Sequence, residues 1–222
     1  MSLGMIKAII FDFDGVVVES VDIKTEAFRE LFQQYPQHLD AILQFHLDHG
    51  GISRQEKIKH FYKNILKVSL SESQLKQLCD RFSDLVKSKV VAASFVKGAE
   101  DLLNKCRGRY KLFVVSGTPE DEMREIVHLR KIQDFFSGVY GSPTKKADLT
   151  RNILKEHHYQ PNEVVFIGDA ITDFNAAKET GVYFIARSAD QSFPWLKDKY
   201  IKAKFKDLVG VWECLQKLDS VT

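Results

Sequence analysis

Two carboxylates stand two residues apart at the end of the first apolar run of the chain, AIIFDFDG. Asp12 and Asp14 close this run, and Gly15 follows directly. Two like charges 4 Å apart repel each other by roughly 1 kcal/mol in water and about 4 kcal/mol in a protein-like medium. A hydrophobic segment that carries this pair therefore predicts a compensating positive charge nearby, such as a metal cation.

Three further polar groups follow later apolar runs. They are Ser116-Gly117-Thr118, the segment 141–146 with Lys145 and Lys146, and Gly168-Asp169 with Asp173. Each group taken alone is typical of a turn, a helix start or a solvated surface. Because the carboxyl ends of parallel strands meet at one edge of a sheet, we expect all four groups to converge there.

The apolar runs that precede these groups have the length of strands. They cover residues 7–13, 111–115, 138–140, 164–167 and 182–186, and most are continuous rather than alternating. Continuous runs are typical of parallel strands buried on both faces. Helical periodicity separates the runs, and Thr118-Pro119-Glu120 predicts a helix that Thr118 caps. The sequence thus indicates an α/β fold with a parallel central sheet flanked by helices.

One interval lacks strands and contains only amphipathic helices. We expect them over residues 23–32, 39–49, 53–66 and 71–91, with capping boxes that begin at Ser53 and Ser71. The interval predicts an all-helical cap domain over residues 19–95, inserted into a catalytic core that comprises residues 5–18 and 96–222.

The composition excludes several classes of protein. The chain has 222 residues, 44% of them hydrophobic, and a net charge of +2 from 32 basic and 30 acidic residues. This balance predicts a globular protein without a nucleic-acid or membrane partner. The three cysteines are far apart and lack metal-ligand spacing, which favours free thiols and a cytoplasmic location. The oligomeric state, monomer or dimer, stays open.

The carboxylates predict a particular cation. Asp12, Asp14, Asp169 and Asp173 offer hard oxygen ligands, which suit Mg²⁺ together with water and phosphate oxygens. A lysine, Ser116 and the amides of the following turn supply positive field for a phosphate group. The set favours a small phosphorylated substrate.

With these motifs in this order, the sequence resembles the haloacid dehalogenase-like hydrolase superfamily, and within it the phosphatases and phosphomutases with a helical cap. The matching segments are DFDGV, the serine after its hydrophobic strand, GSPTKK and GDAITD. The resemblance covers nearly the whole chain and implies a Rossmann-like core.

The resemblance also implies roles for the matching residues. Asp12 would attack phosphorus and become an aspartyl-phosphate, and Asp14 would protonate the leaving oxygen and then activate water. The side chains of Asp12 and Asp169 and the backbone carbonyl of Asp14 would bind Mg²⁺. Asp173 would hold a metal-bound water or orient the lysine, and Ser116 would bind the phosphoryl oxygens.

Two further assignments concern the catalytic lysine and a substrate-binding residue of the cap. Relatives with a Gly-Ser-Pro-x-x-Lys spacing use the last lysine, which favours Lys146 over Lys145 for catalysis and phosphate binding, alongside Gly117. In the cap, Arg54 follows a Gly-Gly break and is our candidate for substrate binding, although it could equally be a surface residue.

The expected reaction is hydrolysis of a small phosphorylated metabolite, such as a sugar phosphate or a phosphoglycolate-like ester. A phosphomutase of the β-phosphoglucomutase type and a phosphate-binding module with slow turnover are the alternatives. The presence of Asp14 disfavours dehalogenation. Phosphonate cleavage would need a cap lysine that forms an imine, and we expect the lysines of the third helix, Lys57, Lys59 and Lys63, to face solvent.

Overall fold

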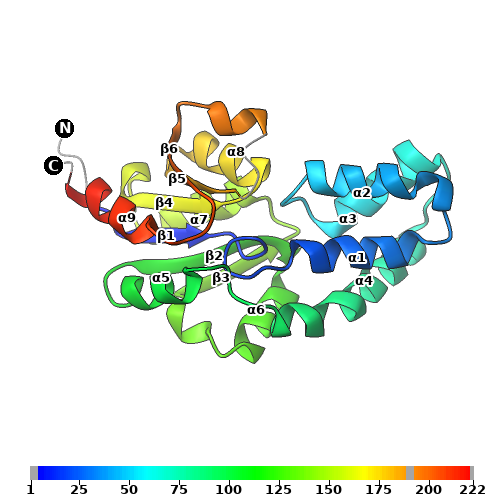
Figure 1. Ribbon diagram of the computed structural model, residues 1–222, viewed down its shortest axis with the longest axis horizontal. Helices are drawn as coiled ribbons and strands as arrows, with labels where there is room; N and C mark the ends of the chain where they lie inside the picture. The colour runs from blue at the N-terminus through cyan, green and yellow to red at the C-terminus, as the bar shows by residue number, and fades with distance from the viewer. Residues whose placement is uncertain (1–4, 189–192, 221–222) are drawn as a thin grey trace.

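A computed structural model of the protein describes residues 5–188 and 193–220 and contains a parallel sheet beside a group of helices (Figure 1). The strands are β1 (Ala8–Phe11), β2 (Lys111–Pro119), β3 (Gly138–Ser142), β4 (Val164–Gly168), β5 (Tyr183–Arg187) and β6 (Ile201–Phe205). They are ordered β3-β2-β1-β4-β5-β6, and every neighbouring pair is parallel. β1 is therefore central, and its end lies between the ends of β2 and β4.

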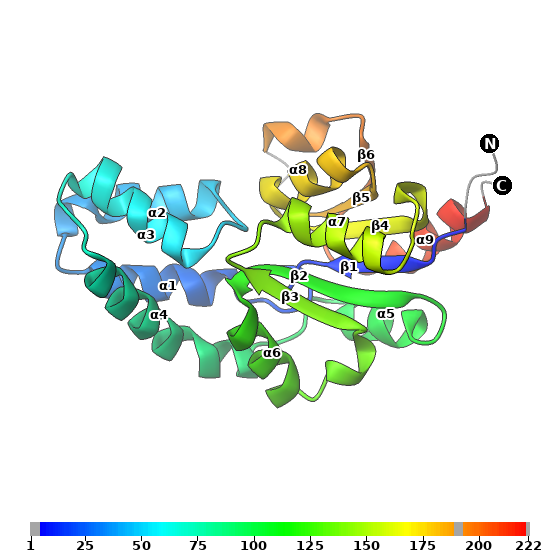
Figure 2. The ribbon, with the colours of Figure 1, turned by 180° about the vertical axis from the view of Figure 1, so that it is seen from behind.

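Helices cover both faces of this sheet (Figure 2). Ile9 and Phe11 of β1 belong to one core cluster with α5 (Ala99–Cys106), α6 (Glu120–Leu129) and α9 (Val211–Ser220). Ala8 and Ile10 belong to the other, with α7 (Lys146–Glu156) and α8 (Ile171–Thr180). Because successive side chains of a strand point to opposite faces, a strand buried on both faces must be apolar throughout. The predicted α/β fold class is confirmed.

The segment between β1 and β2 contains a helical lobe, formed by α1 (Val21–Phe32), α2 (Leu39–Asp48), α3 (Arg54–His60) and α4 (Glu72–Ala92). Residues 12–110 are all described and contain no named strand. Two connecting segments join the lobe to the sheet and run side by side: Glu19 N–H donates to Ser94 O, and Val96 N–H donates to Val17 O, both at 3.0 Å. The domain boundaries 5–18, 19–95 and 96–222 remain a prediction.

The predicted helix caps in the lobe form, whereas the one after β2 does not. Ser71 and Gln74 make a reciprocal capping box, and Ser53 Oγ accepts from Glu56 N–H. The prediction that Thr118 caps a helix is wrong, because β2 continues to Pro119 and α6 begins at Glu120. Pairing of Pro119 with Ser142 of β3 extends the strand and leaves the Thr118 hydroxyl to the site described below.

The sequence reading missed β6, which lies at the sheet edge. Its lysines, Lys202 and Lys204, alternate with half-buried Ile201, Ala203 and Phe205. This period of two is the signal of a half-buried strand, and edge lysines are a common guard against pairing with other chains. Among the described residues, no helix is long and apolar enough to cross a bilayer.

Candidate active site

The ends of β1 and β4 bring three carboxylates together. Asp12 follows β1, Asp169 follows β4, and Asp173 lies in the first turn of α8. One oxygen from each lies within 4.8 Å of the other two. The expected convergence of strand ends is therefore found for these three residues.

A buried lysine joins this carboxylate group from a third strand end. Lys146 Nζ lies 2.8 Å from Asp12 Oδ2 and 2.6 Å from Asp173 Oδ1, and the residue is only 6% exposed. Burial alone would lower the lysine pKa, but the two carboxylates outweigh it and raise the pKa. Lys145, at the N-cap position of α7, is exposed. The geometry thus favours Lys146 over Lys145 as the lysine of the site.

The carboxylate group carries more negative charge than its one lysine neutralises. Burial, opposed by Lys146 and reinforced by Asp173, raises the pKa of Asp12 to about 7, and burial with Asp12 raises that of Asp169 well above its usual value. Asp169 makes no hydrogen bond or ion pair with the described residues. An unpaired carboxylate beside two buried ones is a donor set that fits a divalent cation with oxygen ligands.

Gly15 makes room for this arrangement. Its φ is +75°, and a Cβ at this position would lie 2.2 Å from Asp169 Oδ2. Only glycine combines this left-handed backbone with the close approach of a carboxylate. The position after Asp14 is therefore a glycine because the Asp169 carboxylate occupies the space that a Cβ would take.

Asp14 lies outside the carboxylate group and has partners of its own. Its carboxylate accepts from Lys24 Nζ at 2.5 Å, Ser20 Oγ at 2.6 Å and Thr118 Oγ1 at 3.2 Å. Burial alone would raise the pKa of Asp14, but Lys24 and these hydrogen bonds lower it below its usual value. The side chain is held as an ionised carboxylate, and its roles as acid and base and in metal binding through its backbone carbonyl remain predictions.

Ser116 and Gly117 occupy the end of β2. Ser116 is buried, and its Oγ accepts from Thr118 N–H at 3.1 Å, so the hydroxyl proton is free to donate. A Cβ on Gly117 would lie 2.4 Å from Gly51 O, so β2 and the lobe meet closely here. The position of Ser116 and Gly117 is compatible with their predicted contact with a phosphoryl group.

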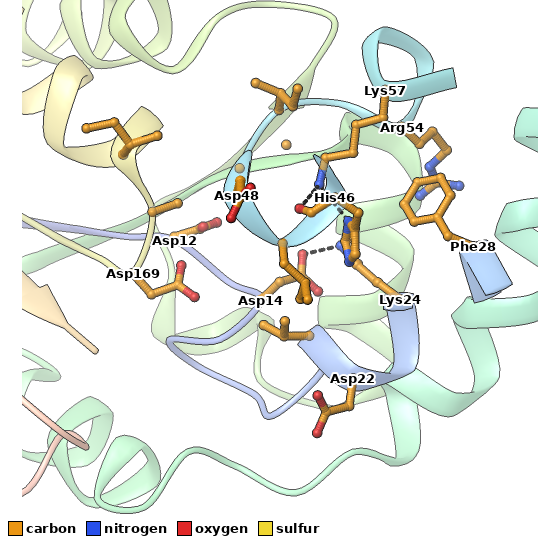
Figure 3. Close-up of a pocket in the computed structure, with 18 of the residues that line it drawn as sticks. Asp12, Asp14, Asp22, Lys24, Phe28, His46, Asp48, Arg54, Lys57 and Asp169 are labelled. Atoms are coloured by element: carbon orange, nitrogen blue, oxygen red, sulfur yellow. Dashed lines mark hydrogen bonds and ion pairs between the residues drawn. The ribbon is translucent and has the colours of Figure 1, made fainter. Parts of the chain in front are cut away.

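A cavity of about 640 Å³ lies between the sheet edge and the helical lobe. Asp12, Asp14 and Asp169, which follow β1 and β4, line it together with Lys24, His46 and Lys57 of the lobe (Figure 3). Phe193 and Trp195, near the end of β5, also line it. The carboxylates and the cap residues thus face one shared space.

The expectation that Lys57 faces solvent is wrong. Lys57 is 4% exposed, and its Nζ lies 2.7 Å from Nδ1 of His46, which is also buried. Burial and the charge of Lys24 lower the pKa of Lys57 to about 7. Burial and Lys57 lower the pKa of His46 to about 3, so its ring is neutral. Solvent exposure was the reason for excluding a cap lysine that forms an imine, and it does not apply to Lys57.

Arg54 lines the cavity, but its guanidinium is already paired. Arg54 Nη2 lies 2.5 Å from Glu122 Oε1, Nη1 lies 2.9 Å from Glu122 Oε2, and Ser83 also bonds to Nη1. The guanidinium carbon lies 4.8 Å from the centroid of the Phe82 ring. Because Glu122 belongs to α6, this buried pair ties α3 of the lobe to the sheet domain. Its role in substrate binding remains a prediction.

Sequence reasoning missed Lys24, His46, Lys57 and Glu122. Arg54, Lys57, Ile58 and Phe61 are spaced i, i+3, i+4 and i+7, the pattern of one helix face, so the burial of Lys57 had a signal in the sequence. The contact of Glu122 with Arg54 joins residues 68 positions apart, and that of Lys24 with Asp14 spans ten residues across a turn, so no helix or strand periodicity indicates either of them.

Comparisons with known proteins agree with this geometry. A family profile described as haloacid dehalogenase-like hydrolase matches residues 9–187. A phosphoglycolate phosphatase of Vibrio cholerae is 26% identical over 188 residues, which cover 80% of this chain and 82% of that protein.

Solved structures share the fold. CbbY from Rhodobacter sphaeroides, in complex with phosphate, superposes with a TM-score of 0.74 at 18% identity and covers 96% of this chain and 100% of its own. A haloacid dehalogenase-like family hydrolase from Streptococcus pneumoniae gives a TM-score of 0.70 at 22% identity over 96% and 99%. Because the profile spans most of the chain, the expected family is confirmed: this protein belongs to the haloacid dehalogenase-like hydrolases.

Proposed function

We propose that this protein is a Mg²⁺-dependent phosphatase that hydrolyses a small phosphomonoester through an aspartyl-phosphate. The observation that carries the proposal is the buried group of Asp12, Lys146, Asp173 and Asp169 at the edge of an open cavity. The similarity to a phosphoglycolate phosphatase supports the same class of reaction.

In the first half-reaction, a carboxylate oxygen of Asp12 forms a bond to phosphorus while the bond from phosphorus to the leaving oxygen breaks. Lys146, next to that carboxylate, and the Ser116 hydroxyl stabilise the phosphoryl oxygens. A Mg²⁺ ion held by Asp12 and Asp169 would neutralise charge on the phosphoryl group. Asp173 holds the lysine in place, because it accepts from Lys146 Nζ and from Ala170 N–H.

In the second half-reaction, Asp14 takes a proton from water, which attacks phosphorus and releases Asp12. The observed contacts of Asp14 with Lys24, Ser20 and Thr118 keep the carboxylate ionised, as a base must be. Protonation of the leaving oxygen in the first half-reaction requires Asp14 to carry a proton, which the adjacent charge of Lys24 disfavours. Lys24 is accordingly a positioning residue for this proton transfer.

Phosphate release from a set of phosphoesters, measured with Mg²⁺ and with EDTA, tests the proposal. We expect release that requires Mg²⁺ and is lost in Asp12→Asn, with the folded state checked by circular dichroism. Exposed Asp80, at 60% side-chain exposure, provides the matched control Asp80→Asn, which should keep wild-type activity. Isomerisation of a sugar phosphate with a bisphosphate primer, without phosphate release, would identify a mutase and contradict hydrolysis. A folded wild type inactive in both assays would favour the binding module.

A further inference from the structure

Two buried nitrogens in the helical wall of the cavity lack an anionic partner. Lys57 Nζ lies 2.7 Å from His46 Nδ1 and donates to His46 O at 3.0 Å, and it makes no ion pair within the described part of the chain. His46 Nε2 is buried and has no hydrogen-bond partner there either. Buried polar groups of native proteins nearly always have partners, so an unpartnered ring nitrogen beside a buried lysine without a counter-ion needs an explanation.

The protonation state of Lys57 determines which group each nitrogen offers. An ammonium at Lys57 donates to Nδ1 of His46, which must therefore be the unprotonated nitrogen of a neutral ring. The ring proton then lies on Nε2, so this nitrogen is a donor without an acceptor. The third proton of the ammonium is a donor of the same kind, because its other two protons are bonded to His46. With Lys57 protonated, these residues thus offer two N–H donors and a positive charge.

The surroundings do not supply the missing negative charge. Among the carboxylates that act on Lys57, Asp14 has the largest effect, and it is already paired with Lys24. Arg54, on the same helix as Lys57, is neutralised by Glu122. A buried ammonium without a counter-ion is unfavourable, and a bound anion would relieve it.

We propose that Lys57 Nζ and His46 Nε2 form a subsite for a second anionic group of the substrate, a carboxylate or a second phosphate, while the phosphoester lies at Asp12. This inference rests on the proposed phosphatase function and names its substrate class. Both ends of such a molecule meet the same cavity, because Asp12 and Lys57 line it together (Figure 3). A neutral hydroxyl in the subsite would accept a hydrogen bond but leave the lysine charge unbalanced.

Matched pairs of esters test this subsite in the presence of Mg²⁺. The carboxylate arm compares 2-phosphoglycolate with 2-hydroxyethyl phosphate, and the phosphate arm compares propane-1,3-diol bisphosphate with 3-hydroxypropyl phosphate. We expect the wild type to prefer the anionic member of one pair by about 10- to 100-fold in kcat/KM, the range of one charge-assisted hydrogen bond. The arm with the larger preference identifies the anion.

The variants separate the subsite from the rest of the cap. Lys57→Met should abolish most of this preference, mainly through KM, and His46→Phe should reduce it. The control is Lys59→Met on the same helix, since the side chain of Lys59 is 51% exposed. It should keep the wild-type preference. If Lys57→Met does not fold, as judged by urea unfolding, His46→Phe carries the test.

Each result has a distinct meaning. A wild type active on both members of a pair but without preference in either arm overturns the subsite and leaves the phosphatase function standing. A wild type inactive on all four esters and on p-nitrophenyl phosphate overturns both. A preference retained in Lys57→Met and His46→Phe overturns the subsite, as does covalent trapping of Lys57 by cyanoborohydride with an aldehyde-bearing phosphoester.

Discussion

Replacing Asp12 by asparagine should make the metal-free protein more stable while it removes activity. The carboxylate group holds more negative charge than Lys146 balances, and burial raises the pKa of Asp12 from 3.8 to about 7. Asparagine keeps the shape of the side chain and removes one of these charges. The variant thus relieves a repulsion that the folded wild type must tolerate.

The pKa shift sets the magnitude. A rise of about 3 pKa units, at 1.36 kcal/mol for each, corresponds to roughly 4 kcal/mol of unfolding free energy at a pH above both values. Between pH 4 and pH 7 the folded wild type retains a proton that the unfolded chain has lost. Its stability therefore falls as the pH rises through this window, and the advantage of Asp12→Asn grows with it.

Urea unfolding in EDTA at pH 8 and at pH 5 measures both effects. We expect the midpoint of Asp12→Asn to exceed that of the wild type at pH 8, by a margin that shrinks at pH 5. Added Mg²⁺ should raise the wild-type midpoint more than that of the variant, because a ligand that binds the folded state stabilises it and the variant lacks one carboxylate. An Asp12→Asn midpoint equal to or below the wild type in EDTA at pH 8 would refute the reasoning. Asp80→Asn should leave the midpoint unchanged.

Three other substitutions test the remaining parts of the site. Lys146→Met should lower kcat by about 100-fold or more because it removes a donor to the phosphoryl group, whereas Lys145→Met should change kcat less than about threefold, as steady-state kinetics would reveal. Glu122→Gln leaves a buried guanidinium without its charge partner and should cost about 3 kcal/mol in urea unfolding, whereas Lys87→Met, at an exposed pair that joins α4 to the same helix α6, should cost less than about 1 kcal/mol. Equal losses in these two would contradict the assignment. Gly15→Ala should lower stability by at least about 1 kcal/mol and weaken the response of the urea midpoint to Mg²⁺, because a Cβ would meet a carboxylate oxygen at 2.2 Å on a backbone with φ of +75°. Wild-type values in both measurements would show that the loop adapts.

The pattern of residues along the chain was enough to predict the class of fold and to identify the acidic residues at the ends of its strands. Continuous apolar runs such as the one before Asp12 are typical of strands that are buried on both faces of a parallel sheet. In such a sheet, the residues after the strands must share one edge, which is why Asp12, Asp169 and Lys146 could be grouped without coordinates. Local periodicity and strand order carry this information.

Only the tertiary structure decided what the cap contributes. The period of a helix indicates that Arg54 and Lys57 share a face, but it does not say what that face packs against. The fold puts Glu122 of α6 on the first of these side chains and His46 of α2 on the second. One charge is thereby neutralised and the other is left open to the cavity, because each partner comes from a different helix whose position depends on how the lobe packs on the sheet.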